Sequence, residues 1–174
     1  MTTRFVSHAL DRTRGRFVKD DRIVGGYGGQ PFSDSSFINM HLRGITVYSH
    51  RGIHQIQVLY EKDGELCWAD EHGTIIGPWN LSKEAFLLEP GEVINRIEGC
   101  SGDKIDALQF FTNTGRSSNR CGGYGGVPFT WKGQELVFFS GRAGDQLDSL
   151  QAHWCGRSTE SHMIHAPPPP QAKF

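Results

Sequence analysis

The sequence predicts an all-β domain in which three small antiparallel sheets surround a pseudo-threefold axis. The chain has 22 glycines among 174 residues, well above the usual share of about 7%. Short runs of β-branched and aromatic residues alternate with turn residues, which is typical of many short strands. No segment sustains a period of about 3.6 residues, so no substantial helix is expected. Short motifs also recur three times, which indicates a repeated supersecondary unit.

Strand-like runs bounded by glycine or turn clusters follow one another from Ile23 to Trp154. In chain order they include Ile45–Tyr48, Gln55–Tyr60, Leu66–Trp68, Ala85–Leu88, Ile105–Phe111, Leu136–Phe139 and Leu150–Trp154. Several of these runs alternate cleanly. Ile56, Val58 and Tyr60, for example, would share one face of a sheet.

Two phrases are written twice in the sequence. GGYGGQPF at Gly25–Phe32 recurs as GGYGGVPF at Gly122–Phe129, and GDKIDALQ at Gly102–Gln109 recurs as GDQLDSLQ at Gly144–Gln151. A third, degenerate copy surrounds Pro78, and the prolines at positions 31, 78 and 128 set a period of 47 and then 50 residues. This spacing fits about four strands of 8–12 residues per unit.

The third copy has lost the chemistry of the other two. His54 stands where the aspartate of the G-x-x-x-D phrase should be, and Ile75-Ile76 replaces Gly-Gly. Three segments nevertheless share an apolar–acceptor–x–apolar–Gln core. They are Ile53–Gln57, Ile105–Gln109 and Leu147–Gln151.

The intact phrases have the chemistry that recognition of a neutral polyol requires. A Gly-Gly turn exposes backbone N–H groups and lets a ligand approach closely. The aspartate of G-x-x-x-D can accept hydrogen bonds from two neighbouring hydroxyls, while the N–H groups of Asp145 and Gln146 can donate. Hydrogen bonds to a charged group contribute roughly 1.5–3 kcal/mol, against about 1 for neutral ones, so the aspartates should dominate affinity.

A structural alternative remains for the same residues. The glycine phrases can be turns that close the fold, and Asp106 and Asp148 can cap turns through their side chains. Tyr27 and Tyr124 can be core or rim residues, or platforms on which a sugar stacks.

Four motifs resemble the jacalin-related lectins. They are GGYGG-x-PF, LEPGEVINRIEG at 88–99, LQFFTNTG at 108–115 and FFSGRAGDQLDSLQAHW at 138–154. The resemblance runs from about Ile23 to Trp154, with the motifs in family order and spacing. It implies a β-prism I fold of three four-stranded Greek-key sheets, and reversible sugar binding without metal, cofactor or enzymatic turnover.

The resemblance also implies which residues form the sites. The first site pairs the N-terminal glycine loop with the last G-x-x-x-D loop, and Asp148 is its acceptor carboxylate. Its residues are Gly29, Gly144, Asp145, Gln146 and Asp148. Because this glycine loop lies inside a continuous chain, the first site resembles that of the family members that bind mannose or glucose. A second site is expected within one repeat, from Gly102, Asp103, Lys104, Asp106 and Gly126. The third repeat is not expected to hold a sugar.

The composition and the two ends of the sequence indicate the domain bounds, the localisation and the partners that are not expected. We expect a basic arm at residues 1–22, the lectin-like domain at 23–155, and a disordered Pro-rich tail at 156–174 containing Pro167–Pro170. The net charge of −1 gives no general attraction to nucleic acid or to an anionic membrane. No run reaches the roughly 20 apolar residues of a membrane helix, and no signal-peptide core is apparent. We therefore expect a cytoplasmic protein, released if at all by a non-classical route, with free thiols at its four cysteines.

Metal sites are disfavoured by the same sequence. His50, His54 and His72 are close in sequence. On a β loop, however, side chains four residues apart do not point to one place as they do on a helix. His153, Cys155, His162 and His165 form another loose cluster, which fits a solvated tail better. Asp103 with Asp106 lacks the further oxygen ligands of a calcium loop.

Two other function classes remain as alternatives. A glycosidase needs two carboxylates that flank one bond, and Asp145 and Asp148 are too close in sequence for that. No Ser/His/Asp, Cys/His or phosphate-loop signature stands out. A β-prism could instead serve as a protein-interaction or targeting module. In that case Asp148→Ala would leave partner binding intact.

Overall fold

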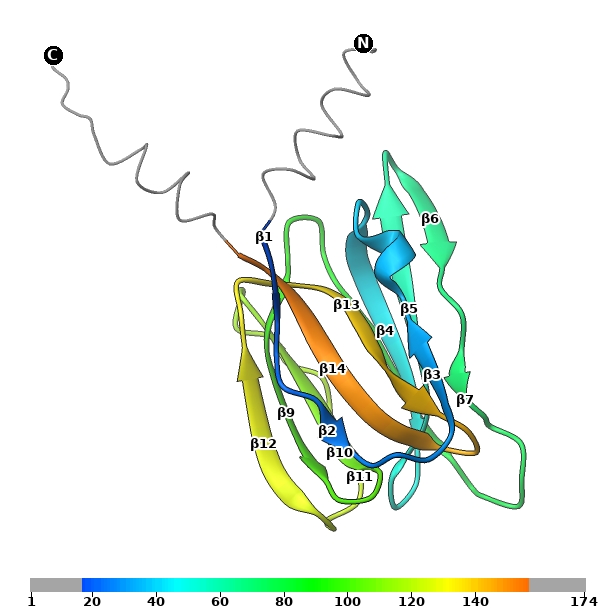
Figure 1. Cartoon of the computed structure of the whole chain (residues 1–174). Coiled ribbons are helices and arrows are strands. Elements are labelled where there is room, and N and C mark those ends of the chain that lie inside the picture. Colours follow the sequence, from blue (N-terminus) through cyan, green and yellow to red (C-terminus); the bar gives the residue numbers. More distant parts are fainter. Residues whose placement is uncertain (1–16, 157–174) are drawn as a thin grey trace, which may run out of the picture.

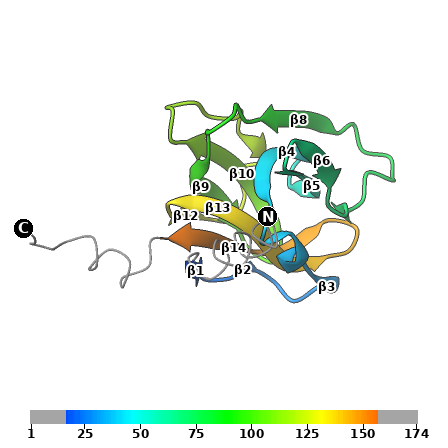
Figure 2. The same cartoon turned by 90° about the horizontal axis from the view of Figure 1, so that it is seen from above.

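Three antiparallel sheets face a shared interior in the computed structural model, which describes residues 17–156 (Figures 1 and 2). The strands are β1 (Phe17–Asp20), β2 (Val24–Gly25), β3 (Gln30–Ser33), β4 (His41–Ser49), β5 (Ile53–Lys62), β6 (Glu65–Trp68), β7 (His72–Gly73), β8 (Ser82–Leu87), β9 (Ile94–Ser101), β10 (Ile105–Thr112), β11 (Cys121–Gly122), β12 (Val127–Lys132), β13 (Glu135–Ala143) and β14 (Leu147–Gly156). A short 3-10 turn, η1 (Ser35–Phe37), follows β3. None of the helical structure in the described residues is long and apolar enough to cross a membrane.

All three sheets share one plan, which confirms the expected β-prism I arrangement. Each has a central hairpin: β13–β14, β9–β10 or β4–β5. The second strand of the hairpin pairs with an edge strand that precedes the glycine turn, and the first strand pairs with the edge strand that follows it. In two sheets these strands are consecutive in the chain. The other sheet combines β1, β2 and β3 with β13 and β14, so both ends of the described chain meet in it.

The edge strand before each glycine turn is broken, and this explains the repeated glutamine. β1 and β2 pair with different parts of β14, and β6 and β7 pair with different parts of β5. At each break a glutamine Nε2 donates to a backbone carbonyl that has left the strand ladder. The bonds are Gln57 to Ala69 (2.9 Å), Gln109 to Ser118 (2.9 Å) and Gln151 to Asp21 (2.8 Å). The glutamine side chain thus satisfies a carbonyl that the sheet leaves unpaired.

The expected irregular arm differs from the structure at its end. Residues Phe17–Asp20 form β1 and pair with β14, so the folded domain starts earlier than residue 23. The strand was missed because its four residues carry no apolar alternation and are recognised only by their pairing. The expected Pro-rich tail, and the arm before residue 17, lie outside the described residues.

The inward positions of the three motif copies lie in the core. Ile53, Ile105 and Leu147 are fully buried, as are their partners three positions later, Ile56, Leu108 and Leu150. Burial of each such side chain contributes roughly 1.5–3 kcal/mol. The four cysteines are free thiols. This packed frame holds the loops at each end of the sheets in fixed positions.

Candidate functional site

The repeated phrases gather at one end of the prism, the lower end in Figure 1. The three hairpin loops share one backbone hydrogen bond. It joins Gly144 N–H to the Gln146 carbonyl (2.9 Å), Gly102 to Lys104 (2.9 Å) and His50 to Gly52 (3.0 Å). The turns that follow the broken edge strands are also anchored alike. Gly26, Gly123 and Thr74 donate to the carbonyls of Asp148, Asp106 and His54, at 2.8, 2.9 and 3.1 Å. The backbone is therefore threefold even where the side chains differ.

The first predicted site is assembled around the Asp148 carboxylate. A Cβ on Gly28 would lie 2.6 Å from Oδ1, and one on Gly29 would lie 2.5 Å from Oδ2. The same carboxylate oxygen, Oδ2, is 3.7 Å from the Cβ position of Gly144. Gly29 has φ of +69°, which also favours glycine. Only glycines allow this turn to close over the carboxylate, and the predicted residues Gly29, Gly144 and Asp148 are brought together.

Arg142 fixes the glycine turn of this site, and the sequence reasoning missed it. Its guanidinium donates from Nε to the Gly28 carbonyl (3.0 Å) and from Nη2 to the Gly29 carbonyl (2.9 Å). The only signal was its position two residues before Gly144, at the end of β13. Arg142 is a positioning residue because it holds the backbone that faces the carboxylate.

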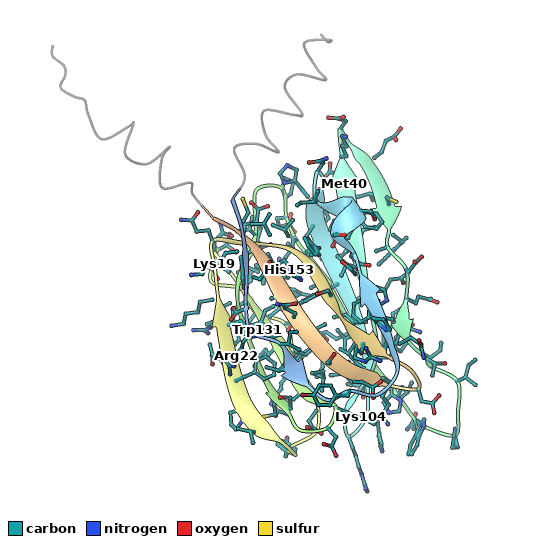
Figure 3. The ribbon with its side chains drawn as sticks, viewed as in Figure 1. Lys19, Arg22, Met40, Lys104, Trp131 and His153 are labelled. Carbon is teal, nitrogen blue, oxygen red and sulfur yellow. The ribbon has the colours of Figure 1, made fainter. Side chains whose placement is uncertain are left out.

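Lys104 is predicted in the second site, and its backbone lies in the hairpin loop of that site. Its side chain instead reaches the first: Nζ lies 2.7 Å from Oδ1 of Asp148. The lysine side chain is 44% exposed and that of Asp148 only 4%. The two loops meet because Gly26 has no Cβ to collide with the Asp103 carbonyl. Figure 3 labels Lys104 at this end of the prism.

The second predicted site repeats the first around Asp106. A Cβ on Gly126 would collide with Asp106 Oδ2 and would lie 2.8 Å from the Ser101 carbonyl carbon. Gly102 faces the same oxygen, with its Cβ position 3.8 Å away. Burial, and then the charge of Asp103, raise the pKa of the Asp106 carboxyl above its ordinary value. Within residues 17–156 no hydrogen bond or ion pair engages this carboxylate. Gly102, Asp103, Asp106 and Gly126 thus come together as predicted.

The third loop pair is filled by aromatic rings. Trp79 lies with its ring centroid 5.5 Å from that of buried His54 and 6.0 Å from that of His50. Burial, followed by the charge of His50, lowers the pKa of His54 below its ordinary value. Ile76, in place of a glycine, is 83% exposed. This pair offers neither a carboxylate nor a double-glycine turn.

His72 does not join the other two histidines of the zinc hypothesis. Its Nε2 lies 2.9 Å from Asp34 Oδ1, and its ring stacks on Phe32 at a centroid distance of 3.7 Å. Among the described residues no group of three His, Cys, Asp or Glu side chains could hold a metal ion.

Tyr27 and Tyr124 are almost fully exposed at the site end, so the core alternative is wrong for both. The guanidinium of Arg120 lies over the Tyr124 ring, 4.8 Å from its centroid. Both rings therefore stand exposed at the rim of this end of the prism.

A Ser–His–Asp array that the sequence did not reveal lies on the sheet built from β1, β13 and β14. His153, labelled in Figure 3, has Nε2 2.7 Å from Ser140 Oγ and Nδ1 2.7 Å from Asp20 Oδ1. Nucleophilic catalysis would also need N–H groups aimed at a developing oxyanion. The Ser140 backbone is instead paired on both sides, with Ser33 and Gln151, inside the sheet. The array therefore links the three strands.

Comparison with known proteins agrees with this geometry. A model of the jacalin-like lectin domain matches residues 22–153. Jacalin-related lectin 3 of Arabidopsis thaliana is 33% identical over 141 residues, 74% of this chain and 22% of its own length. Myrosinase-binding protein 2 of the same plant is 29% identical over 140 residues, 79% of this chain and 20% of its own length. This chain thus spans only about a fifth of these relatives' length.

Among solved structures, artocarpin, described as a lectin with mannose specificity, superposes with a TM-score of 0.69 at 25% identity. The match covers 78% of this chain and 96% of artocarpin. With the duplicated carboxylate loops and the three-sheet fold, these matches show that the chain belongs to the jacalin-like lectin family.

Proposed function

We propose that this protein binds mannose- or glucose-type glycans reversibly, without metal and without turnover, at two sites per chain. Site 1 consists of Gly29, Gly144, Asp145, Gln146 and Asp148. Site 2 consists of Gly102, Asp103, Asp106 and Gly126, with the Lys104 backbone in its loop. One observation carries the proposal: at two places the same double-glycine turn closes over a carboxylate.

Each site offers a fixed acceptor for hydroxyl groups. The carboxylate can accept from two neighbouring hydroxyls of one sugar, and the missing Cβ atoms let the turn lie close against it. The choice of mannose is supported by artocarpin, which has been solved with methyl α-mannoside at 25% identity and with a mannopentose at 26%.

Both sites lie at the same end of the prism, which favours binding to surfaces and to branched glycans. A monosaccharide should bind weakly, with Kd on the order of mM, or about −4 kcal/mol. Two sites, multiplied by any oligomer, would raise avidity toward branched glycans by roughly 10²–10⁴.

Titration calorimetry with methyl α-mannoside tests the proposal. Two binding events per chain are expected, unchanged by EDTA. Asp148→Asn should remove one, Asp106→Asn the other, and the double variant both. A glycan array with and without EDTA gives the sugar class independently. Absence of sugar binding by the folded wild type, or loss of binding with EDTA, would contradict the proposal.

A protein-interaction role is the second candidate, because the third loop pair presents apolar side chains to solvent. Ile75, Ile76 and Trp79 are exposed where the other two turns carry glycines and an inward-packed ring. One relative is also named for a protein that it binds, myrosinase. A partner held in this way should stay bound when both site aspartates are replaced by asparagine, and should be released by Ile76→Asp.

A further inference from the structure

Sites 1 and 2 share a backbone but differ in one charged contact, the ammonium of Lys104 on the carboxylate of site 1. We propose that Lys104 is a specificity-determining residue that disfavours neutral sugars at site 1, so that site 2 carries most of the affinity for them. This inference rests on the proposed sugar binding.

The first argument is the occupancy of acceptor atoms. Lys104 Nζ lies 2.7 Å from Asp148 Oδ1, whereas Oδ2 faces Gly29 and Gly144. A sugar whose two hydroxyls donate to both oxygens must displace the ammonium or give up one hydrogen bond. At site 2 the Asp106 carboxylate has no such competitor within residues 17–156.

The second argument is electrostatic. The Asp148 side chain is almost wholly buried, so its charge is weakly screened and its ammonium partner is held more strongly than an exposed one would be. At site 2, by contrast, Asp103 adds negative charge next to Asp106. A hydroxyl donor thus meets a neutralised acceptor at site 1 and an uncompensated one at site 2.

The third argument is that Lys104 cannot easily move away as a whole. Its carbonyl accepts from Gly102 N–H at 2.9 Å, and its loop abuts the Gly26 turn. Only the long side chain can swing aside. Its backbone belongs to one site while its charge acts on the other.

The repeat itself supplies a matched variant. Gln146 occupies the loop position that corresponds to Lys104, so Lys104→Gln copies a residue that this backbone already accepts. Lys132→Gln, at the far end of β12, is the control for loss of one positive charge.

Calorimetry with methyl α-mannoside measures the effect of Lys104 on sugar affinity. It is done in the Asp106→Asn background, in which site 2 is removed and site 1 remains. Lys104→Gln should tighten site 1 by about fivefold, the factor expected from a partly exposed ion pair. Raising salt from about 20 to about 500 mM should strengthen the sugar affinity of site 1 when Lys104 is present and have little effect after Lys104→Gln. Lys132→Gln should change neither.

In the otherwise wild-type chain, Asp106→Asn should remove more of the mannoside affinity than Asp148→Asn. Sugar binding that is unchanged or weakened by Lys104→Gln overturns this inference while leaving the lectin function standing. No binding by any folded variant, including Lys104→Gln, overturns the lectin function and this inference with it. Circular dichroism and thermal unfolding establish that each variant is folded.

Discussion

Replacing Gly126 by alanine should weaken sugar binding at site 2 while leaving the domain folded. Gly126 has φ of +84°, a region that costs roughly 1–2 kcal/mol for a residue with a Cβ. The added Cβ would collide with Asp106 Oδ2 and would lie 2.8 Å from the Ser101 carbonyl carbon. Ordinary carbon contacts are about 3.5–4.0 Å, so the turn must retreat by about 1 Å.

That retreat would disturb the contact that we propose between the sugar hydroxyls and the Asp106 carboxylate. Loss of one charge-assisted hydrogen bond, worth about 1.5–3 kcal/mol, corresponds to roughly a 10- to 150-fold weaker Kd. Calorimetry with methyl α-mannoside in the Asp148→Asn background isolates site 2 for this measurement.

Gly115→Ala is the control for backbone cost. Gly115 has φ of +87°, and its Cβ would meet nothing within 4 Å. It should lose a similar 1–2 kcal/mol of stability in thermal unfolding but keep its sugar affinity. If Gly126→Ala binds within about twofold of its parent, or if Gly115→Ala weakens binding equally, the steric reasoning fails.

Three further changes test other parts of the structure. Asp106→Asn should raise the thermal midpoint at neutral pH, because a raised pKa means that the ionised carboxylate costs stability above it. As the pH is lowered, Asp106 takes up its proton at a higher pH than an ordinary aspartate does, so sugar affinity at site 2 should begin to fall at that higher pH. A Kd that does not change with pH would contradict this. Gln109→Ala should cost about 1–3 kcal/mol in denaturant unfolding, because the Ser118 carbonyl loses its donor, with sugar binding retained. Burial alone would raise the pKa of Glu92, but hydrogen bonds lower it to about 2. The donors are Thr112, the backbone N–H of Glu89, Thr114 and Arg116. The stability that Glu92 contributes should therefore be lost as pH falls from about 4.5 toward 2. In denaturant unfolding, Glu92→Gln should lower the free energy of unfolding at neutral pH and reduce its dependence on pH in that acid range.

The sequence predicted what depends on local, repeated patterns. The three sheets, the two glycine turns and the two aspartates all follow from phrases whose meaning is contained in a few adjacent residues. The different chemistry of the third copy was also visible, because His54 and Ile75-Ile76 replace the aspartate and the two glycines.

Other features depend on contacts between distant segments. Strand β1 pairs along the edge of β14, and its four residues carry no apolar alternation that would reveal a strand. The contact of Lys104 with Asp148 depends on how loops of two different sheets meet. The spacing of residues within one repeated phrase does not predict such a contact. The repeat of Gln57, Gln109 and Gln151 is visible in the sequence. Its role, donation to a backbone carbonyl where an edge strand breaks, requires the structure.

The division of one sheet between the two ends of the chain sets an order in which the sites can be assembled. Site 2 lies within a single run of consecutive strands, so its loops meet once a short segment has folded. Site 1 joins Gly29 to Asp148 and must await the closure of nearly the whole domain, which costs more chain entropy. We expect refolding chains, and chains emerging from the ribosome, to gain site 2 before site 1. A cut that releases β1–β3 would likewise remove site 1 alone.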